Sequence, residues 1–81
     1  MHRYLIVIEK TDDGYSAYVP DVPGVATVGD TIEDILENMQ EALELYFEVA
    51  IERGQPLPPV SAVQAGFIEV EEAKFAAKAM A

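Results

Sequence analysis

Four of the aspartates in this sequence could do chemistry together, because nucleases use grouped carboxylates to hold two divalent metal ions. They are Asp12, Asp13, Asp21 and Asp30. Each also has a simpler structural role. Asp12 and Asp13 belong to a predicted hairpin turn, Asp21 follows a proline in a second turn, and Asp30 stands at the start of a predicted helix. We therefore predict no metal site and no cofactor, and keep a metal-dependent nuclease as the third of three functional hypotheses.

The remaining candidates for catalysis are one histidine and two serines. His2 stands at the chain terminus without an obvious carboxylate partner, which favours an exposed residue over a general base. Ser16 and Ser61 lack the Gly-x-Ser-x-Gly context of an activated nucleophile. We predict that the protein is not an enzyme.

The charge balance points to a different class of partner. Fifteen acidic residues stand against five Lys and Arg among 81 residues, for a formal charge of −10. Such a chain is repelled by phosphate backbones, so direct nucleic-acid binding is disfavoured and a basic protein partner is favoured. The first apolar run is too short for a signal peptide or a membrane span, and we expect a soluble cytoplasmic protein with no membrane contact.

A chain of this length is expected to form one domain, residues 1–81, with a thin core. Without cysteine, neither disulfides nor thiolate metal sites can reinforce it, and oligomerisation is the remaining route to more buried area. We therefore expect a homo-oligomer, either a dimer or a tetramer.

The sequence pattern predicts an α+β fold in the order βββαβ. Alternating and β-branched residues indicate an antiparallel meander, with Asp13-Gly14 marking its hairpin and Pro23-Gly24 a later type II turn. A 3.6-residue period follows, with Asp30 or Thr31 as the helix cap and Gly54 just past the end. A fourth strand is expected parallel to the first, followed by a short helix. The predicted bounds are strands 3–9, 14–19 and 25–28, helix 31–53, strand 66–70 and helix 71–80.

The predicted long helix has two contrasting faces. An apolar stripe from Ile32 to Ala50 should pack on the sheet, while the opposite arc is acidic and carries no basic residue. That arc is either a solvated face or an electrostatic surface for a basic protein. Ala42, Leu45 and Val49 widen the apolar arc, which indicates either a helix-mediated subunit contact or ordinary burial at the flank.

Three segments of the chain form a specific pattern: "IEKTDDGYSAYVPDVPGV", with its Pro-Asp-x-Pro-Gly motif, "GDTIEDILENMQEALELYFE", and the loop "GQPLPPVS". In these segments the chain resembles the HicB antitoxin family. The resemblance covers residues 3 to about 70. Val25 stands where many members have cysteine, and only eleven residues follow Val70, where many members carry a DNA-binding domain. The resemblance therefore implies a minimal member of the family, for which direct DNA binding is not expected.

The resemblance implies a partial RNase H-like fold without catalysis, acting as an antitoxin that neutralises a small basic HicA-type mRNA interferase. An acidic protein would inhibit such a toxin by occupying its RNA-binding surface. The alternative is an orphan oligomeric protein-binding domain with no cognate toxin. For the toxin interface we predict Tyr18, Asp21 and Pro23 in the motif with Glu41, Glu44 and Glu48 on the helix, and for the oligomer contact Ala42, Leu45 and Val49.

Overall fold

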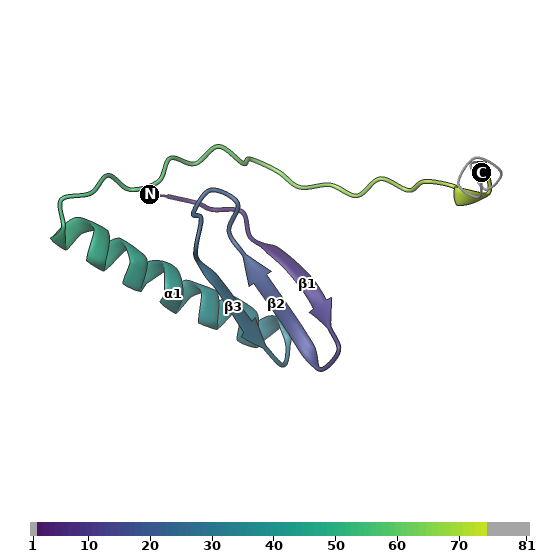
Figure 1. Ribbon diagram of the computed structural model, residues 1–81, viewed down its shortest axis with the longest axis horizontal. Helices are drawn as coiled ribbons and strands as arrows, with labels where there is room; N and C mark the ends of the chain where they lie inside the picture. The colour runs from purple at the N-terminus through teal and green to yellow at the C-terminus, as the bar shows by residue number, and fades with distance from the viewer. Residues whose placement is uncertain (1, 75–81) are drawn as a thin grey trace.

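The computed structural model describes residues 2–74, which form a three-stranded antiparallel sheet followed by one long helix (Figure 1). The strands pair in the order β1-β2-β3. The predicted α+β meander and long helix are therefore confirmed. The elements are β1 (Val7–Thr11), β2 (Gly14–Tyr18), β3 (Ala26–Gly29), α1 (Ile32–Glu52) and a single 3₁₀ turn, η1 (Glu72–Lys74).

The hairpin between β1 and β2 forms where it is predicted, but its glycine has a different role. Thr11 pairs with Gly14, so Asp12 and Asp13 are the two turn residues. Gly14 is buried, and a Cβ atom added to it would lie 2.6 Å from the carbonyl oxygen of Gly29. Glycine is therefore needed here because β3 approaches closely.

The first strand is shorter at its start than predicted. Its ladder begins at Val7, which pairs with Tyr18, rather than at residue 3. Further pairing toward the N-terminus would bring Pro20 into the ladder, and proline has no backbone N–H to donate. Residues 2–6 therefore run beside the body without strand pairing.

The chain leaves β2 through two consecutive turns. The N–H of Val22 donates to the carbonyl of Val19 at 3.1 Å, and the N–H of Val25 donates to the carbonyl of Val22 at 3.3 Å. Gly24 has a φ of 91°, which is the positive value required at the third position of a type II turn. The predicted Pro23-Gly24 turn is confirmed.

Helix α1 is capped at both ends by the residues that the pattern indicates. Thr31 is the N-cap, and its hydroxyl accepts a hydrogen bond from the N–H of Asp34 at 3.1 Å. At the other end Gly54 takes a φ of 66°, and the N–H of Gln55 donates to the carbonyl of Ala50 at 2.8 Å. This is the hydrogen bond of a Schellman motif, which satisfies carbonyls that the helix leaves open.

The core lies where α1 crosses β2 and β3. Its buried residues are Ala17, Val19, Val22, Ile35 and Met39. Because the helix contacts mainly these two strands, the half of the same sheet face that belongs to β1 is less well covered. Leu36, which was predicted to pack on the sheet, is 52 % exposed for this reason.

The predicted fourth strand and C-terminal helix are wrong for the described residues. Residues 66–70 are extended but pair with no strand of the sheet, so the parallel placement beside β1 does not occur. The helix predicted over 71–80 is described only as far as residue 74, where η1 is a single 3₁₀ turn and not an α-helix, and residues 75–80 lie outside the described residues. A β-rich pattern supplies strand propensity but does not supply a neighbouring strand, which has to come from the tertiary structure.

Candidate functional site

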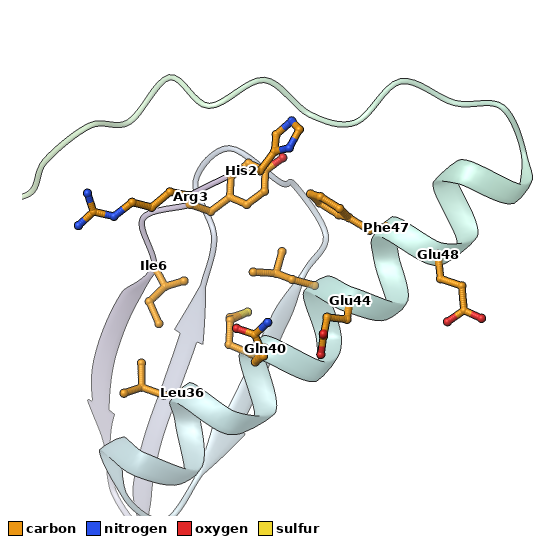
Figure 2. Close-up of a pocket in the computed structure, with 11 residues that line it drawn as sticks. His2, Arg3, Ile6, Leu36, Gln40, Glu44, Phe47 and Glu48 are labelled. Atoms are coloured by element: carbon orange, nitrogen blue, oxygen red, sulfur yellow. The ribbon is translucent and has the colours of Figure 1, made fainter.

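A groove of about 750 Å³ runs between the N-terminal segment and α1 (Figure 2). All of its lining residues come from the segment before β1 and from α1. Its apolar lining consists of Ile6 from the segment before β1 and of Leu36, Met39 and Leu43 from α1. Such a concave apolar surface with a few polar groups at its edge is typical of binding sites.

An aromatic cluster closes one end of the groove. The ring of His2 lies 5.9 Å from that of Tyr4 and 5.4 Å from that of Phe47, and the rings of Tyr4 and Phe47 meet edge to face at 5.8 Å. Edge-to-face contacts of this kind stabilise by about 0.5–1.5 kcal/mol each beyond their buried area. The cluster holds the N-terminal segment against α1, and so fixes one wall of the groove.

The sequence reasoning missed this aromatic cluster. His2 was predicted as an exposed terminal residue, and it is exposed, but its ring also packs on two others. The alternation of His2 and Tyr4 was the one available signal, since residues two apart in an extended segment point to the same side.

The edge of the groove along α1 is acidic. Glu44 and Glu48 line it, and both side chains are exposed (Figure 2). They belong to a row of carboxylates along the helix that contains no basic residue before Arg53. The row consists of Glu33, Asp34, Glu37, Glu41, Glu44, Glu48 and Glu52. Like charges three or four residues apart destabilise a helix by about 0.2–0.5 kcal/mol per pair, so the row carries a cost in stability.

Asp21 fastens the chain that follows α1 to the turn after β2. Its Oδ2 accepts hydrogen bonds from the N–H groups of Ser61 at 2.8 Å and of Ala62 at 2.9 Å. The hydroxyl of Ser61 donates to its Oδ1. Nearby, the hydroxyl of Tyr4 donates to the carbonyl of Pro58. These bonds hold the proline-containing segment against the body.

Two pKa values at this anchor are shifted in opposite directions, each for its own reason. The hydroxyl of Ser61, followed by the N–H groups of Ala62 and Ser61, lowers the pKa of Asp21 below its ordinary value of 3.8. Desolvation raises the pKa of Tyr4 above 10.0, and the neighbouring Asp21 and Tyr46 raise it further. Asp21 is therefore ionised and engaged within its own chain at neutral pH, while Tyr4 remains a hydrogen-bond donor.

The six residues predicted for the toxin interface fall on separate surfaces. Glu44 and Glu48 line the groove, whereas Glu41 is exposed on α1 outside it. Tyr18 neighbours the buried Ala17 in β2 and so points to the sheet face opposite the helix. Pro23 is exposed in the turn, and Asp21 holds the segment after α1.

The three residues predicted for an oligomer contact are brought together. Ala42, Leu45 and Val49 line one shallow hollow of about 350 Å³, together with Tyr46 and with Gly24, Val25 and Ala26 from the other side. Leu45 is 60 % exposed in this hollow. An apolar patch therefore lies between α1 and the β3 side of the molecule.

Two further classes of site are absent from residues 2–74. No group of three or more His, Asp or Glu side chains there is placed to hold a metal ion. No helix in the same range is long and apolar enough to cross a membrane.

Residues 4–80 match the family model described as the HicB-like antitoxin of bacterial toxin-antitoxin systems. A UPF0150 protein of Synechocystis sp. is 41% identical over 59 residues, which are 72% of this chain and 75% of that protein. Antitoxin HicB 2 of Photorhabdus laumondii is 35% identical over 78 residues, which are 96% of this chain but 55% of the relative. The chain thus spans about half the length of that antitoxin.

A solved structure of a HicA3 and HicB3 toxin-antitoxin complex contains a chain similar in both fold and sequence. The TM-score is 0.63 at 38% identity, over 73% of this chain and 70% of that one.

Proposed function

We propose that this chain, which belongs to the HicB-like antitoxin family, binds and neutralises a small basic HicA-type mRNA interferase. The family match over residues 4–80 and the similarity to a chain of a HicA3–HicB3 complex support this partner. Antitoxins of this family are binding proteins, so the membership of this chain in the family confirms the prediction that it is not an enzyme. Toxin and antitoxin would meet in the cytoplasm.

The observation that carries the proposal is the row of carboxylates along α1 beside the groove, all of which except Asp34 are exposed. An RNA-cleaving protein needs a basic surface to hold phosphates. A row of carboxylates competes for that surface, speeds the encounter and blocks access of RNA. The repulsion within the row, which costs stability in the free chain, would be relieved in the complex.

The groove beside this row would add short-range apolar contacts to the binding of the toxin. Charges at the edge of an interface mainly govern the association rate and the dependence on salt, while buried apolar anchors govern the dissociation rate. Leu36 and Leu43 offer apolar surface directly beside Glu44 and Glu48. A toxin segment that presents an apolar side chain flanked by Lys or Arg fits this arrangement.

The proposal is tested by reversing charges at the edge of the groove. The double variant Glu44→Lys and Glu48→Lys should bind the toxin about tenfold or more weakly, which corresponds to about 1.4 kcal/mol, and should inhibit RNA cleavage less. The matched control is Asp12→Lys with Asp13→Lys, which changes the net charge equally at exposed positions of the hairpin turn, outside both the groove and the row of carboxylates. Calorimetric titration and an RNA-cleavage assay measure both effects.

Equal losses in both double variants would show that the toxin senses net charge and not the groove. Unchanged inhibition in the groove variant would remove α1 from the interface. Tyr18, Asp21 and Pro23 stay a predicted second contact surface, and Tyr18→Ala is its cleanest test because Tyr18 is 44 % exposed.

The chain also forms a homo-oligomer in this proposal, either a dimer or a tetramer, through the hollow lined by Ala42, Leu45 and Val49. Exposed apolar patches on small domains commonly mark such contacts. The double variant Leu45→Glu and Val49→Glu should lower the molecular mass measured by light scattering after gel filtration. An unchanged mass would place the subunit contact elsewhere. A stable oligomer that binds no toxin would favour the orphan-domain alternative.

A further inference from the structure

Residues 63–70, here called the arm, are an apolar segment whose large side chains are not covered by any other part of the described chain. The arm is extended, and its large apolar side chains are almost fully accessible. Val63 is 90 % exposed, Phe67 100 %, Ile68 88 % and Val70 71 %. Single exposed apolar residues are common on protein surfaces, but four of them within eight residues indicate a surface that another chain covers.

The arm leaves the body at a defined point. The Asp21 carboxylate fixes the chain as far as Ala62, and beyond that point the arm runs away from the sheet and the helix (Figure 1). The radius of gyration is 17.1 Å, whereas a compact domain of 81 residues has a value of roughly 12 Å. The excess reflects the outer part of the arm, residues 66–70, which extends beyond the folded body formed by the other described residues.

The sheet offers a matching acceptor. β1 is an outer strand in the order β1-β2-β3, so the backbone groups along one of its sides have no strand neighbour within the described residues. Unpaired strand edges recruit extended segments, because each added strand supplies the missing backbone hydrogen bonds. The chain enters the arm on the β1 side, since Val63, Gln64 and Ala65 line a hollow with Arg3, Tyr4 and Leu5.

We infer that residues 66–70 of one copy add as a strand to the free edge of β1 in a second copy, and that the second copy reciprocates. The exchange is a closed twofold arrangement, in which the same two elements pair twice. It pairs the backbone of residues 66–70 with β1, brings Ile68 and Val70 to one face of the sheet and Phe67 to the other, and completes the edge of β1 in both copies.

The distribution of charge allows the arm to approach a second copy of this acidic chain. Residues 54–68 carry no charged side chain, although the whole chain has a formal charge of −10. The arm therefore reaches a second copy without bringing carboxylates together along most of its length. Lys10 stands near the end of β1, where it can accept Glu69 of an arm that pairs in the parallel direction.

The chain has no cysteine, so engineered thiols report this contact without background. Glu9→Cys places a thiol at the centre of β1, and Ile68→Cys places one at the centre of residues 66–70. Central positions stay close together whether the strands pair in the parallel or the antiparallel direction. The two single variants are mixed and treated with a short bifunctional thiol reagent, and the products are separated by mass.

The expected product is a species of twice the chain mass that contains one copy of each variant. Val28→Cys on β3 is the matched control for the opposite edge of the sheet, and it should give at least tenfold less product with Ile68→Cys. Three results would overturn the inference. The first is cross-linking within single molecules of the Glu9→Cys, Ile68→Cys double variant at all protein concentrations. The others are cross-linking of Ile68→Cys to a second Ile68→Cys in place of Glu9→Cys, and a yield no higher than that of the control.

A second measurement needs no thiols. Ile68→Asp cannot disturb the core, because Ile68 is 88 % exposed, and it should abolish the dimer that depends on the arm. Gln64→Asp adds the same charge outside residues 66–70 and should leave the mass unchanged. The Leu45→Glu variant should keep the product formed between Glu9→Cys and Ile68→Cys, which separates the arm from the hollow on α1. An unaltered mass for Ile68→Asp would contradict the exchange.

Discussion

Two stretches of this chain have nearly the same β-forming composition, but only one of them forms a paired strand within the described residues. Ile6, Val7, Ile8 and Glu9 enter or flank β1, whereas Phe67, Ile68, Glu69 and Val70 in the arm pair with nothing in the described chain. β1 has a partner because a two-residue turn returns the chain directly beside it. The arm follows a proline-containing segment that has no such turn. Strand propensity is thus converted into a strand only where the chain provides a neighbour.

The largest expected effect comes from truncating a core side chain, and the same truncation in the arm is the comparison. Ile35 is fully buried between α1 and the sheet, so Ile35→Ala should lower the free energy of unfolding by about 2–5 kcal/mol. Ile68→Ala in the arm should change it by less than about 0.5 kcal/mol when measured on dilute monomer. Urea denaturation gives both values. Ile35→Val, with an expected cost of about 0.5–1.5 kcal/mol, is used if the alanine variant does not fold.

Two glycines sharpen the same contrast. In Gly14→Ala the new Cβ would meet the carbonyl oxygen of Gly29 at 2.6 Å, so the strands must shift, at a cost of about 1–3 kcal/mol. Gly66→Ala in the arm meets nothing within 4 Å and should be close to neutral. Thermal unfolding of both variants measures the difference. Equal stability would mean that β2 and β3 can separate locally without loss.

The start of α1 provides a smaller effect. Thr31→Ala removes the hydroxyl that accepts from the N–H of Asp34, and should cost about 1 kcal/mol of the free energy of unfolding. Thr11→Ala is the matched control, because Thr11 is exposed at the end of β1 and caps no helix. A cost as large for Thr11 would show that the loss comes from threonine in general and not from the cap.

The smallest expected effect is local, at the junction between the folded body and the arm. Asp21→Asn should speed hydrogen exchange at the amides of Ser61 and Ala62 while leaving the core amides protected. Asp12→Asn, in the exposed hairpin turn, should leave the exchange of Ser61 and Ala62 unchanged. Nuclear magnetic resonance at neutral pH resolves the two cases.

The same anchor has a pH dependence whose sign follows from the lowered pKa of Asp21. A carboxyl with a lower pKa in the folded state than in the unfolded state stabilises the fold fully above its ordinary value of 3.8. This contribution is lost as the pH falls below 3.8 and through the folded pKa. Protection of Ser61 and Ala62 should therefore hold from neutral pH down to the ordinary value of 3.8 and fade only as the pH falls below it, and it should be absent throughout in Asp21→Asn.

Much of the fold could be predicted because its signals are local. The two-residue hairpin, the Pro23-Gly24 turn, the Thr31 cap and the Gly54 end of α1 each depend on residues within about five positions of one another. The Pro-Asp-x-Pro-Gly motif and the acidic helix also indicated the family correctly. The first strand was predicted too long because the exclusion of Pro20 from the ladder was applied to β2 alone.

The groove could not be predicted from the pattern. The apolar stripe of α1 indicated which side faces the sheet, but not that the helix would cover β2 and β3 and leave the β1 side open. That offset is what exposes Leu36 and opens the space between Ile6 and Leu43. It also separates Glu44 and Glu48, which line the groove, from Tyr18 on the opposite sheet face.

The sequence by itself therefore determined the order of the first four elements, the ends of α1, the acidic helix face and the family. Only the tertiary structure decided that Gly14 is needed for the approach of Gly29, that Asp21 binds residues forty positions away, and that the arm has no strand partner among residues 2–74. The physical reason is the distance along the chain between the interacting groups. Turns and caps are closed by neighbours, whereas these contacts depend on how separate elements pack, and packing leaves no periodic trace in the sequence.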